Sequence, residues 1–184
     1  MEGAIFKKTG ELTSLSEQNL VDCDHNSNAC NGGLEIYAFD YVIGNKGINT
    51  EADYPYVSGD GSRHRCQYDA TKTTLTISSY TEYARGEELM TNTLASEGPL
   101  SVGIDAGQRS FQHYDTGIYY EPNCHKLLLN HAVLAVGYGS TDDGDYYIVK
   151  NSWGTSWGDS GYVLMARYRD NNCGIASDVN LPIA

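Results

Sequence analysis

The first half of the chain has hydrophobic residues at helical spacing. In residues 32–47 apolar side chains recur on one helical face and stop at Gly47, which predicts a helix. Residues 86–99 predict another helix, which a Gly-Pro pair closes. Residues 1–8 form a short apolar and basic run before Gly10, as in the last turns of a helix. We therefore expect this half to be mainly helical.

A further helix is expected over QNLVDC, residues 18–23. Ser14 and Glu17 stand just before it with the spacing of a capping box. In such a box the serine hydroxyl accepts a hydrogen bond from a backbone N–H three residues on, and the acid reaches back to the N–H of the serine. The pattern therefore predicts Ser14 as the N-cap.

The second half of the chain has the period of half-buried strands. Residues 100–104 alternate between apolar and small or polar side chains, and apolar runs follow at 131–139, 145–153 and 161–168, separated by turn signals. The segment 57–65, VSGDGSRHR, is expected to be an exposed loop. Helices followed by strands predict an α+β protein in two parts.

The composition indicates a globular protein and argues against two kinds of partner. A hydrophobic content of 40% is enough to bury a core. Twelve Lys and Arg against 24 Asp and Glu give a formal net charge of −12, which argues against binding to nucleic acid or to an anionic membrane. The longest apolar run is also far too short to span a bilayer.

The chain has five cysteines, an odd number, and none of them forms a C-x-x-C pair. Their wide spacing fits long-range disulfides better than a zinc site or a redox motif. His25 lies between Cys23 and Cys30, but this spacing matches no standard zinc signature, so we expect no metal and no other cofactor. An odd cysteine in an oxidised protein implies a free thiol or a partner elsewhere.

Two residues capable of chemistry stand beside strand-forming sequence. His131 lies in LNHAVLAVGYG, and Asn151 follows in VKNSWGTSWG. Taken alone, such a histidine is more often a structural residue, and such an asparagine is a turn residue. The other four histidines lie in polar surroundings and are expected at the surface.

Taken together, several motifs resemble the papain family of cysteine peptidases, and within it the cathepsin L, K and S group. The motifs are SLSEQNLVDC, CNGG, EADYPY, LNHAV, KNSWG with a following Trp-Gly, and CGIAS, in the family's order along essentially the whole chain. The resemblance implies an α+β fold with a helical left domain and an antiparallel β-barrel right domain. These domains would correspond to about residues 1–80 and 81–184 of an incomplete peptidase domain.

The resemblance also implies a Cys-His-Asn triad that hydrolyses peptide bonds. His131 would take the proton of a cysteine thiol as general base and later return it to the leaving amine. Asn151 would accept a hydrogen bond from the other ring nitrogen and hold the ring in place. Trp153 would cover this pair and keep water from the bond between them.

The nucleophilic cysteine is expected to lie outside residues 1–184. In papain-like enzymes the histidine follows it by about 130 to 150 residues, and counting back from His131 leads to Met1 or beyond. The chain is therefore expected to be N-terminally truncated, to lack the C-G-S-C-W motif of the family, and to be inactive as given. Cys30 follows a helix instead of opening one, which makes it a poor substitute nucleophile.

The family pattern implies disulfides Cys23–Cys66 and Cys124–Cys173, and it leaves Cys30 unpaired because its partner belongs to the absent motif.

A substrate-binding surface is also implied, including the S2 pocket for the second residue before the scissile bond. The residues of the whole surface would be Gly32, Gly33, Leu34, Glu35, Gly103, Leu129, Asn130, Ala132 and Asp178. Of these, Leu34, Glu35, Gly103, Leu129 and Ala132 would line the S2 pocket, with Asp178 at its far end. Glu35 and Asp178 put carboxylates where cathepsin L has small or apolar residues. Either both face solvent at the rim, or Asp178 faces the pocket and attracts a basic side chain.

A cathepsin L-type endopeptidase is therefore the expected function. We expect a monomer that acts on protein or peptide substrates, binds cystatin-like inhibitors or its own propeptide, and works in the lysosome or outside the cell. The alternative is a non-catalytic pseudoenzyme that binds peptides or an inhibitor, although retention of both His131 and Asn151 argues against it. A third interpretation, which we favour, is that the start at Met1 is an artefact of a partial transcript or gene model.

Overall fold

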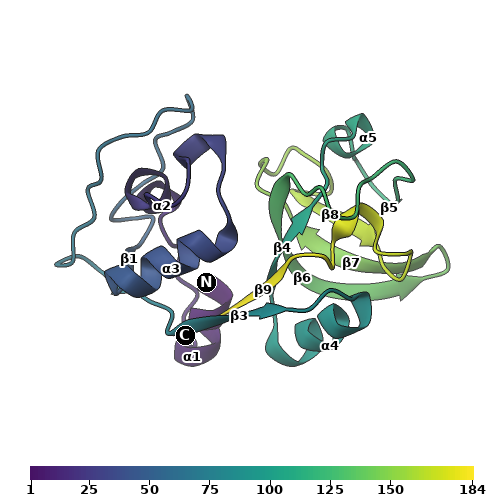
Figure 1. Cartoon of the computed structure of the whole chain (residues 1–184), viewed down its shortest axis with the longest axis horizontal. Coiled ribbons are helices and arrows are strands. Elements are labelled where there is room, and N and C mark those ends of the chain that lie inside the picture. The colour runs from purple at the N-terminus through teal and green to yellow at the C-terminus, as the bar shows by residue number, and fades with distance from the viewer. The chain divides into compact units, whose positions relative to one another are not determined.

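The computed structural model describes all of residues 1–184 and divides them into two compact units. The first unit comprises Met1–Thr81 together with Pro182–Ala184, and the second comprises Glu82–Leu181. Helices α1, α2 and α3 belong to the first unit, and strands β4 to β8 belong to the second (Figure 1). The α+β class predicted from the sequence is confirmed. None of the helices is long and apolar enough to cross a membrane.

Helices dominate the first unit, as the hydrophobic pattern predicts. Gly10 ends α1 in the left-handed conformation, with φ of 77°. Lys46 ends α3 in the same conformation, and the N–H of Gly47 donates to the carbonyl of Val42. The elements are α1 Glu2–Thr9, α2 Glu17–Cys23, the 3-10 helix η1 Ala29–Asn31, α3 Glu35–Asn45, β1 Ile48–Asn49 and β2 Thr74–Leu75.

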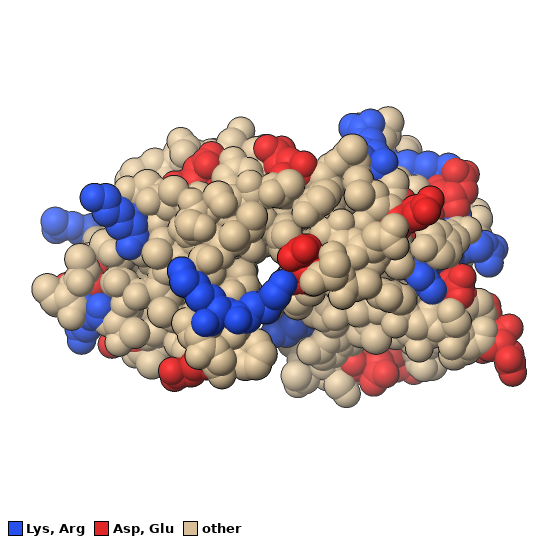
Figure 2. Space-filling view, turned by 90° about the horizontal axis from the view of Figure 1, so that it is seen from below, with Lys and Arg blue, Asp and Glu red and all other residues tan.

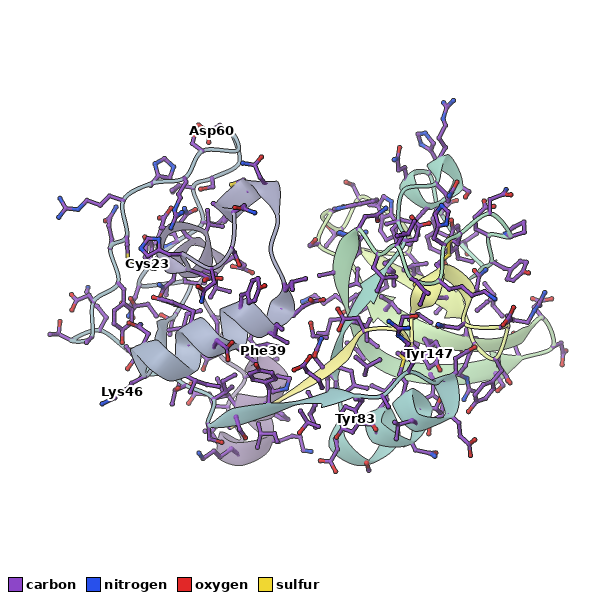
Figure 3. All side chains as sticks on the ribbon, in the orientation of Figure 1. Cys23, Phe39, Lys46, Asp60, Tyr83 and Tyr147 are labelled. Carbon is purple, nitrogen blue, oxygen red and sulfur yellow. A yellow bond between two sulfur atoms is a disulfide. The ribbon has the colours of Figure 1, made fainter.

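A small apolar core holds these elements together. Phe39 projects from α3 (Figure 3), and its ring centroid lies 5.5 Å from that of Tyr80. Val42 lies three residues further along the same helical face and is fully buried. The buried core residues are Ile5, Leu15, Phe39, Val42, Ile48 and Ile77.

The predicted capping box at Ser14 is wrong, because Ser16 is the N-cap of α2. Ser16 Oγ accepts a hydrogen bond from the N–H of Asn19 at 2.9 Å and donates to the carbonyl of Tyr54 at 2.6 Å. The carbonyl of Ser14 accepts from the N–H of Glu51 instead. Leu15 forms an antiparallel bridge with Thr50, and this pairing takes up the backbone groups of Ser14 and Ser16, so the helix begins later than the local pattern predicts.

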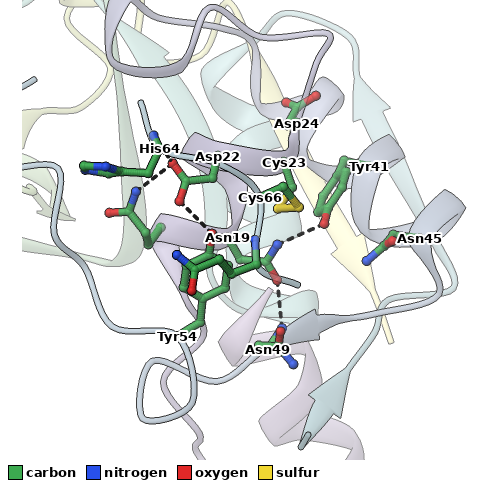
Figure 4. The surroundings of a disulfide bond; sticks show 12 residues. Asn19, Asp22, Cys23, Asp24, Tyr41, Asn45, Asn49, Tyr54, His64 and Cys66 are labelled. Atoms are coloured by element: carbon green, nitrogen blue, oxygen red, sulfur yellow. Dashed lines mark hydrogen bonds between the residues drawn. A yellow bond between two sulfur atoms is a disulfide. The ribbon is translucent and has the colours of Figure 1, made fainter. Parts of the chain in front are cut away.

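The disulfide Cys23–Cys66 ties the end of α2 to an irregular segment (Figure 4). Beside it, the Asp22 carboxylate accepts hydrogen bonds from the Tyr54 hydroxyl at 2.6 Å and from the N–H of His64 at 2.7 Å. Burial would raise the pKa of Asp22, but these hydrogen bonds bring it below its ordinary value. Burial and the bond to the carboxylate raise the pKa of Tyr54 to about 12. The predicted loop 57–65 lies in this segment and is exposed apart from Ser58.

Seven strands form one sheet, in the order β3-β9-β4-β6-β7-β8-β5. The predicted strands are confirmed as β4, β6, β7 and β8, and the helix predicted at 86–99 is α4. Strands β3 and β9 each include residues of both units. The elements are β3 Ser79–Tyr83, α4 Glu87–Glu97, β4 Leu100–Ile104, α5 Arg109–Gln112, β5 Ile118–Tyr119, β6 His131–Thr141, β7 Gly144–Lys150, β8 Tyr162–Ala166, η2 Asn172–Gly174 and β9 Val179–Ile183.

Two features of this sheet are absent from the prediction. β5 is parallel to β8, whereas the pairs β4–β6, β6–β7 and β7–β8 are antiparallel. β9 has the sequence VNLPI, in which Asn180 and Pro182 interrupt the apolar pattern.

The core of the second unit contains side chains from the sheet, from α4 and from the segments around α5 and η2. Tyr147 of β7 is fully buried in it (Figure 3), and its hydroxyl lies 3.0 Å from Thr91 Oγ1 and donates to the carbonyl of Glu87 at 3.1 Å. The alternating residues Leu100, Val102 and Ile104 are all fully buried.

A second disulfide, Cys124–Cys173, links a loop of the second unit to η2. Cys30 is free and exposed. This is the cysteine pairing that the family resemblance implies.

The surface carries charges of both signs. On the face shown in Figure 2, basic side chains occur singly or in small groups, with acidic side chains between them. One basic side chain is buried: Arg167 lies over the rings of Tyr138 and Tyr168, with its Cζ 4.8 and 4.7 Å from their centroids.

Candidate active site

His131 and Asn151 lie at neighbouring ends of two paired strands. β6 begins at His131, and β7 ends at Lys150, directly before Asn151. Because the two strands are antiparallel, the beginning of β6 lies beside the end of β7, and Leu134 pairs with Lys150. The hairpin thereby brings together side chains 20 residues apart, with His131 Nε2 2.8 Å from Asn151 Oδ1.

The same contacts fix the tautomer of the imidazole. Asn151 Oδ1 also accepts a hydrogen bond from the N–H of Ser152 at 2.8 Å. Since an amide oxygen only accepts, Nε2 of His131 must carry the proton. In the neutral ring Nδ1 is then the unprotonated nitrogen, which is the atom able to take up a proton. Asn151 itself is only 8% exposed, and its N–H donates to the carbonyl of Gly161 at 3.0 Å.

Aromatic rings pack around the imidazole. The Trp153 ring centroid lies 5.0 Å from that of His131, with 32° between the ring planes. Phe111 is fully buried, with its ring centroid 6.5 Å from the imidazole and 5.5 Å from Trp153. Trp157 packs against both Phe111 and Trp153. The bond between His131 and Asn151 is part-buried beside these rings, and Trp153 itself remains 40% exposed.

Phe111 is not among the residues predicted from the sequence. It lies in the short helix α5, where its neighbours in RSFQ are polar. The only indication in the sequence that Phe111 is buried is that it is a single large apolar residue in a polar stretch. Its meaning depends on its contact with Trp153 and His131, which come much later in the chain.

Three of the predicted substrate-binding residues lie together in the second unit. A side chain at Gly103 would meet Leu129 Cδ1 at 2.9 Å and Asp178 Cβ at 3.4 Å. The side chains of Leu129 and Asp178 therefore occupy the space over Gly103. Asp178 Oδ1 accepts a hydrogen bond from Asn180 Nδ2 at 2.8 Å. Asn180 is 1% exposed and was not predicted as part of the site.

The other two predicted residues of this unit lie nearby in the chain. Ala132 is exposed and pairs with Gly103 across β4 and β6. Asn130 precedes His131, and its side-chain amide bonds to the segment that follows β4.

The predicted residues of the first unit form one continuous stretch from η1 to α3. Gly32 has φ of 105°, a conformation that favours glycine. A side chain at Gly33 would lie 2.7 Å from Ser27 Cβ, so the close approach of that residue requires glycine. Leu34 is exposed and precedes α3, and Glu35 is the first residue of that helix.

The remaining candidate groups are exposed side chains. His25, His64, His113 and His125 are exposed, as predicted. Cys30 lies in η1, with its Sγ 3.8 Å from the carbonyl of Ser62. No cluster of three or more His, Cys, Asp and Glu side chains is arranged to hold a metal ion.

Comparisons with known proteins agree with this geometry. The model of the papain family cysteine protease matches residues 1–183. A cathepsin L-like peptidase of Aedes aegypti is 50% identical over 187 residues, which cover 100% of this chain and 54% of that protein. The structure of digestive procathepsin L 3 from the Tenebrio molitor larval midgut superposes with a TM-score of 0.93 at 40% identity, covering 100% of this chain and 60% of that one. Bromelain of Ananas comosus, solved with the E64 inhibitor, gives a TM-score of 0.88 at 37% identity, covering 99% of this chain and 83% of that one.

The chain thus spans little more than half the length of the curated relatives it matches. The match nevertheless extends over both units, and the papain-like fold expected from the sequence motifs is confirmed. The chain belongs to the papain family of cysteine proteases and is cathepsin L-like.

Proposed function

We propose that the protein is a cysteine endopeptidase of cathepsin L type, in which His131 is the general base and Asn151 its orienting partner. The observation that carries the proposal is the 2.8 Å contact between His131 Nε2 and Asn151 Oδ1. This contact leaves Nδ1 as the proton acceptor. Trp153 packs beside the imidazole and keeps water from the contact.

The reaction would proceed by two acyl transfers. His131 Nδ1 takes the proton of a cysteine thiol, and the thiolate attacks the carbonyl carbon of the scissile peptide bond. The imidazolium then gives this proton to the leaving amine, which leaves a thioester. Water, deprotonated by the same nitrogen, hydrolyses the thioester and restores the thiol. Throughout, Asn151 keeps Nε2 protonated and the ring in place.

We infer that the nucleophile comes from outside residues 1–184. Four cysteines are held in disulfides, and the thiol of Cys30 is exposed on a 3-10 helix without a histidine partner among its hydrogen bonds. Residues 1–184 alone should therefore not hydrolyse peptides. The activity belongs to a form of the protein that presents a thiol to Nδ1 of His131.

Protein and peptide substrates follow from this chemistry. The bromelain structure contains the E64 inhibitor, and we propose that cystatin-like inhibitors or a propeptide also bind this protein. Its two disulfides favour an oxidising compartment, and relatives from Homarus americanus bear the name digestive cysteine proteinase. We therefore propose the lysosome or the extracellular space as its location.

The test compares hydrolysis of a fluorogenic dipeptidyl substrate under reducing, mildly acidic conditions. One protein consists of residues 1–184, and the other carries an additional N-terminal segment with a papain-type cysteine. We expect turnover only from the second protein. In that form His131→Ala should lower kcat/KM by at least about a hundredfold, because proton transfer is lost. The exposed His113→Ala is the matched control and should leave kcat/KM unchanged.

Two outcomes would count against the proposal. Turnover by residues 1–184 that survives Cys30→Ser but disappears with His131→Ala would contradict the external nucleophile. An extended protein that binds a peptide-like inhibitor and yet shows no turnover would favour the non-catalytic pseudoenzyme.

A further inference from the structure

One buried carboxylate closes the loop that leads into His131. Asp105 follows β4 directly and is 2% exposed. Its Oδ2 accepts a hydrogen bond from the N–H of His125 at 2.8 Å, at the beginning of the loop. Its Oδ1 accepts one from Asn130 Nδ2 at 3.0 Å, at the end of the loop. The two ends of loop 125–130 are thus held by a single side chain.

Asn130 connects Asp105 to His131, because it bonds to Asp105 and directly precedes His131 in the chain. Its Oδ1 accepts a hydrogen bond from the N–H of Ala106 at 2.8 Å, and its own N–H donates to the carbonyl of Ile104 at 3.0 Å. Together with the bond to Asp105, these contacts fix both the backbone and the side chain of Asn130. The next residue, His131, pairs with Ile104 across the sheet. These contacts on both sides of the peptide bond between Asn130 and His131 fix the backbone orientation of His131.

The packing around this contact leaves no spare room. The N–H of Gly107 donates to Asp105 Oδ1 at 3.1 Å. A methyl group at Gly107 would lie 3.1 Å from Asn130 Nδ2 and 3.2 Å from Asp105 Oδ1. Any side chain at this position would press on both partners.

We propose that Asp105 is a positioning residue for His131. Its carboxylate closes loop 125–130 and, through Asn130, sets the direction in which the imidazole presents Nε2 to Asn151. The inference rests on the proposed role of His131 as general base and adds the residue that aligns this base. Loop 125–130 also carries Leu129, which packs over Gly103 beside Asp178. By holding this loop, Asp105 also supports the predicted substrate-binding residues of the second unit.

The surroundings of Asp105 keep it ionised under mildly acidic conditions. Burial would raise its pKa, but the hydrogen bonds from His125, Gly107 and Asn130 bring the pKa below its ordinary value. The titratable groups that face it are the His125 imidazole, whose charge favours the carboxylate, and the Tyr119 hydroxyl. A lowered folded pKa means that the contact is at full strength above the unfolded value of about 3.9. The hydrogen bonds of the Asp105 carboxylate weaken only when the pH falls through the pKa of Asp105 in the folded protein, which is lower than in the unfolded chain.

The test measures how fast the Nε2 proton of His131 exchanges with water, by NMR of the chain labelled with 15N-histidine. The signal is assigned by its loss in His131→Gln. Asp105→Asn keeps the shape of the side chain but replaces one acceptor by an amide donor. Losing a hydrogen bond to a charged group should speed the exchange about tenfold.

The matched control is Asp22→Asn in the first unit. Asp22 is also 2% exposed and also accepts a backbone N–H, but it lies in the network around Cys23. This substitution should lower Tm and yet leave the exchange of the His131 proton within about twofold of wild type, because the sites are independent. Gly107→Ala is a milder second variant, and its methyl group should speed the exchange by pressing on Asp105 and Asn130.

The outcomes separate positioning from general stabilisation. If Asp105→Asn lowers Tm but leaves the exchange rate unchanged, or if Asp22→Asn raises the rate equally, the proposal is overturned. Should Asp105→Asn fail to fold, Gly107→Ala decides, and an unchanged rate in that variant overturns the proposal. The exchange rate of the His131 proton and the peptidase activity are measured separately, so the positioning role can fail while the peptidase function holds. Absence of peptidase activity would remove the role of His131 as general base without changing the measured exchange rate.

Discussion

The two carboxylate oxygens of Asp178 have different surroundings. Oδ1 is occupied by the amide of the buried Asn180, which also fixes the direction of the carboxylate. Oδ2 lies toward Gly103, 3.5 Å from where a side chain at that position would begin. Leu129 supplies an apolar surface beside it. We propose that a substrate side chain packs against this surface, with an aliphatic side chain contacting Leu129 and a cationic one contacting Asp178 Oδ2.

We therefore predict a dual preference at the second residue before the scissile bond. Asp178→Ala should lower the ratio of kcat/KM for Arg-Arg over Leu-Arg dipeptidyl substrates by about one to two decades, which is the effect of a charge-assisted hydrogen bond. The measurement uses a form that carries the nucleophilic cysteine. Asp142→Asn in the exposed turn between β6 and β7 removes an acidic charge elsewhere and should leave the ratio unchanged. An unchanged ratio in Asp178→Ala would mean that this carboxylate faces solvent.

At the level of elements, the start of α2 depends on one serine whose hydroxyl makes two hydrogen bonds. Ser16 Oγ accepts from Asn19 at the first turn and donates to the carbonyl of Tyr54. Ser14 is exposed and makes neither contact.

Ser16→Ala should lower the free energy of unfolding by about 1 to 2 kcal/mol, because it removes the cap and leaves a buried carbonyl without its donor. Ser14→Ala, the matched control, should change it by less than about 0.5 kcal/mol. Denaturant unfolding followed by circular dichroism measures both values. A larger loss for Ser14→Ala would restore the capping box that the local sequence predicts.

Local patterns predict elements correctly where no distant segment competes for the backbone. The alternation at 100–104 and the apolar run from His131 predict β4 and β6, and these strands bring His131 to Asn151. Ser14 fails as a cap because Glu51 takes its carbonyl. β9 escapes prediction because its partner β4 overrides the polar and proline residues within it.

The unpredicted members of the site have the same kind of explanation. Phe111 and Asp105 act through contacts with residues distant in the chain. Asn180 bonds to Asp178 only two residues before it, but its own burial comes from the packing of the fold. Their own neighbours in the sequence carry no motif that reveals these contacts.

At the level of the whole molecule, each unit has one disulfide. Cys23–Cys66 and Cys124–Cys173 join residues 43 and 49 positions apart. Closing loops of this length stabilises each unit by about 4 kcal/mol in the chain-entropy estimate. Cys30 is the free thiol that remains.

Alkylation of the unreduced protein should therefore label Cys30 alone, and mass spectrometry of the resulting peptides locates the label. An exposed free thiol should also give disulfide-linked dimers in air, which Cys30→Ser abolishes. Label found mainly on any other cysteine would contradict the pairing.

The return of Pro182–Ala184 to the first unit makes that unit discontinuous in sequence. The carbonyl of Ile183 accepts hydrogen bonds from the N–H and the hydroxyl of Ser78, at 2.7 and 3.1 Å. On a ribosome, the second unit is therefore fully synthesised before residues 182–184 of the first unit emerge. Residues 1–81 are thus synthesised first, but Ser78 can form its hydrogen bonds to Ile183 only after the whole second unit has emerged.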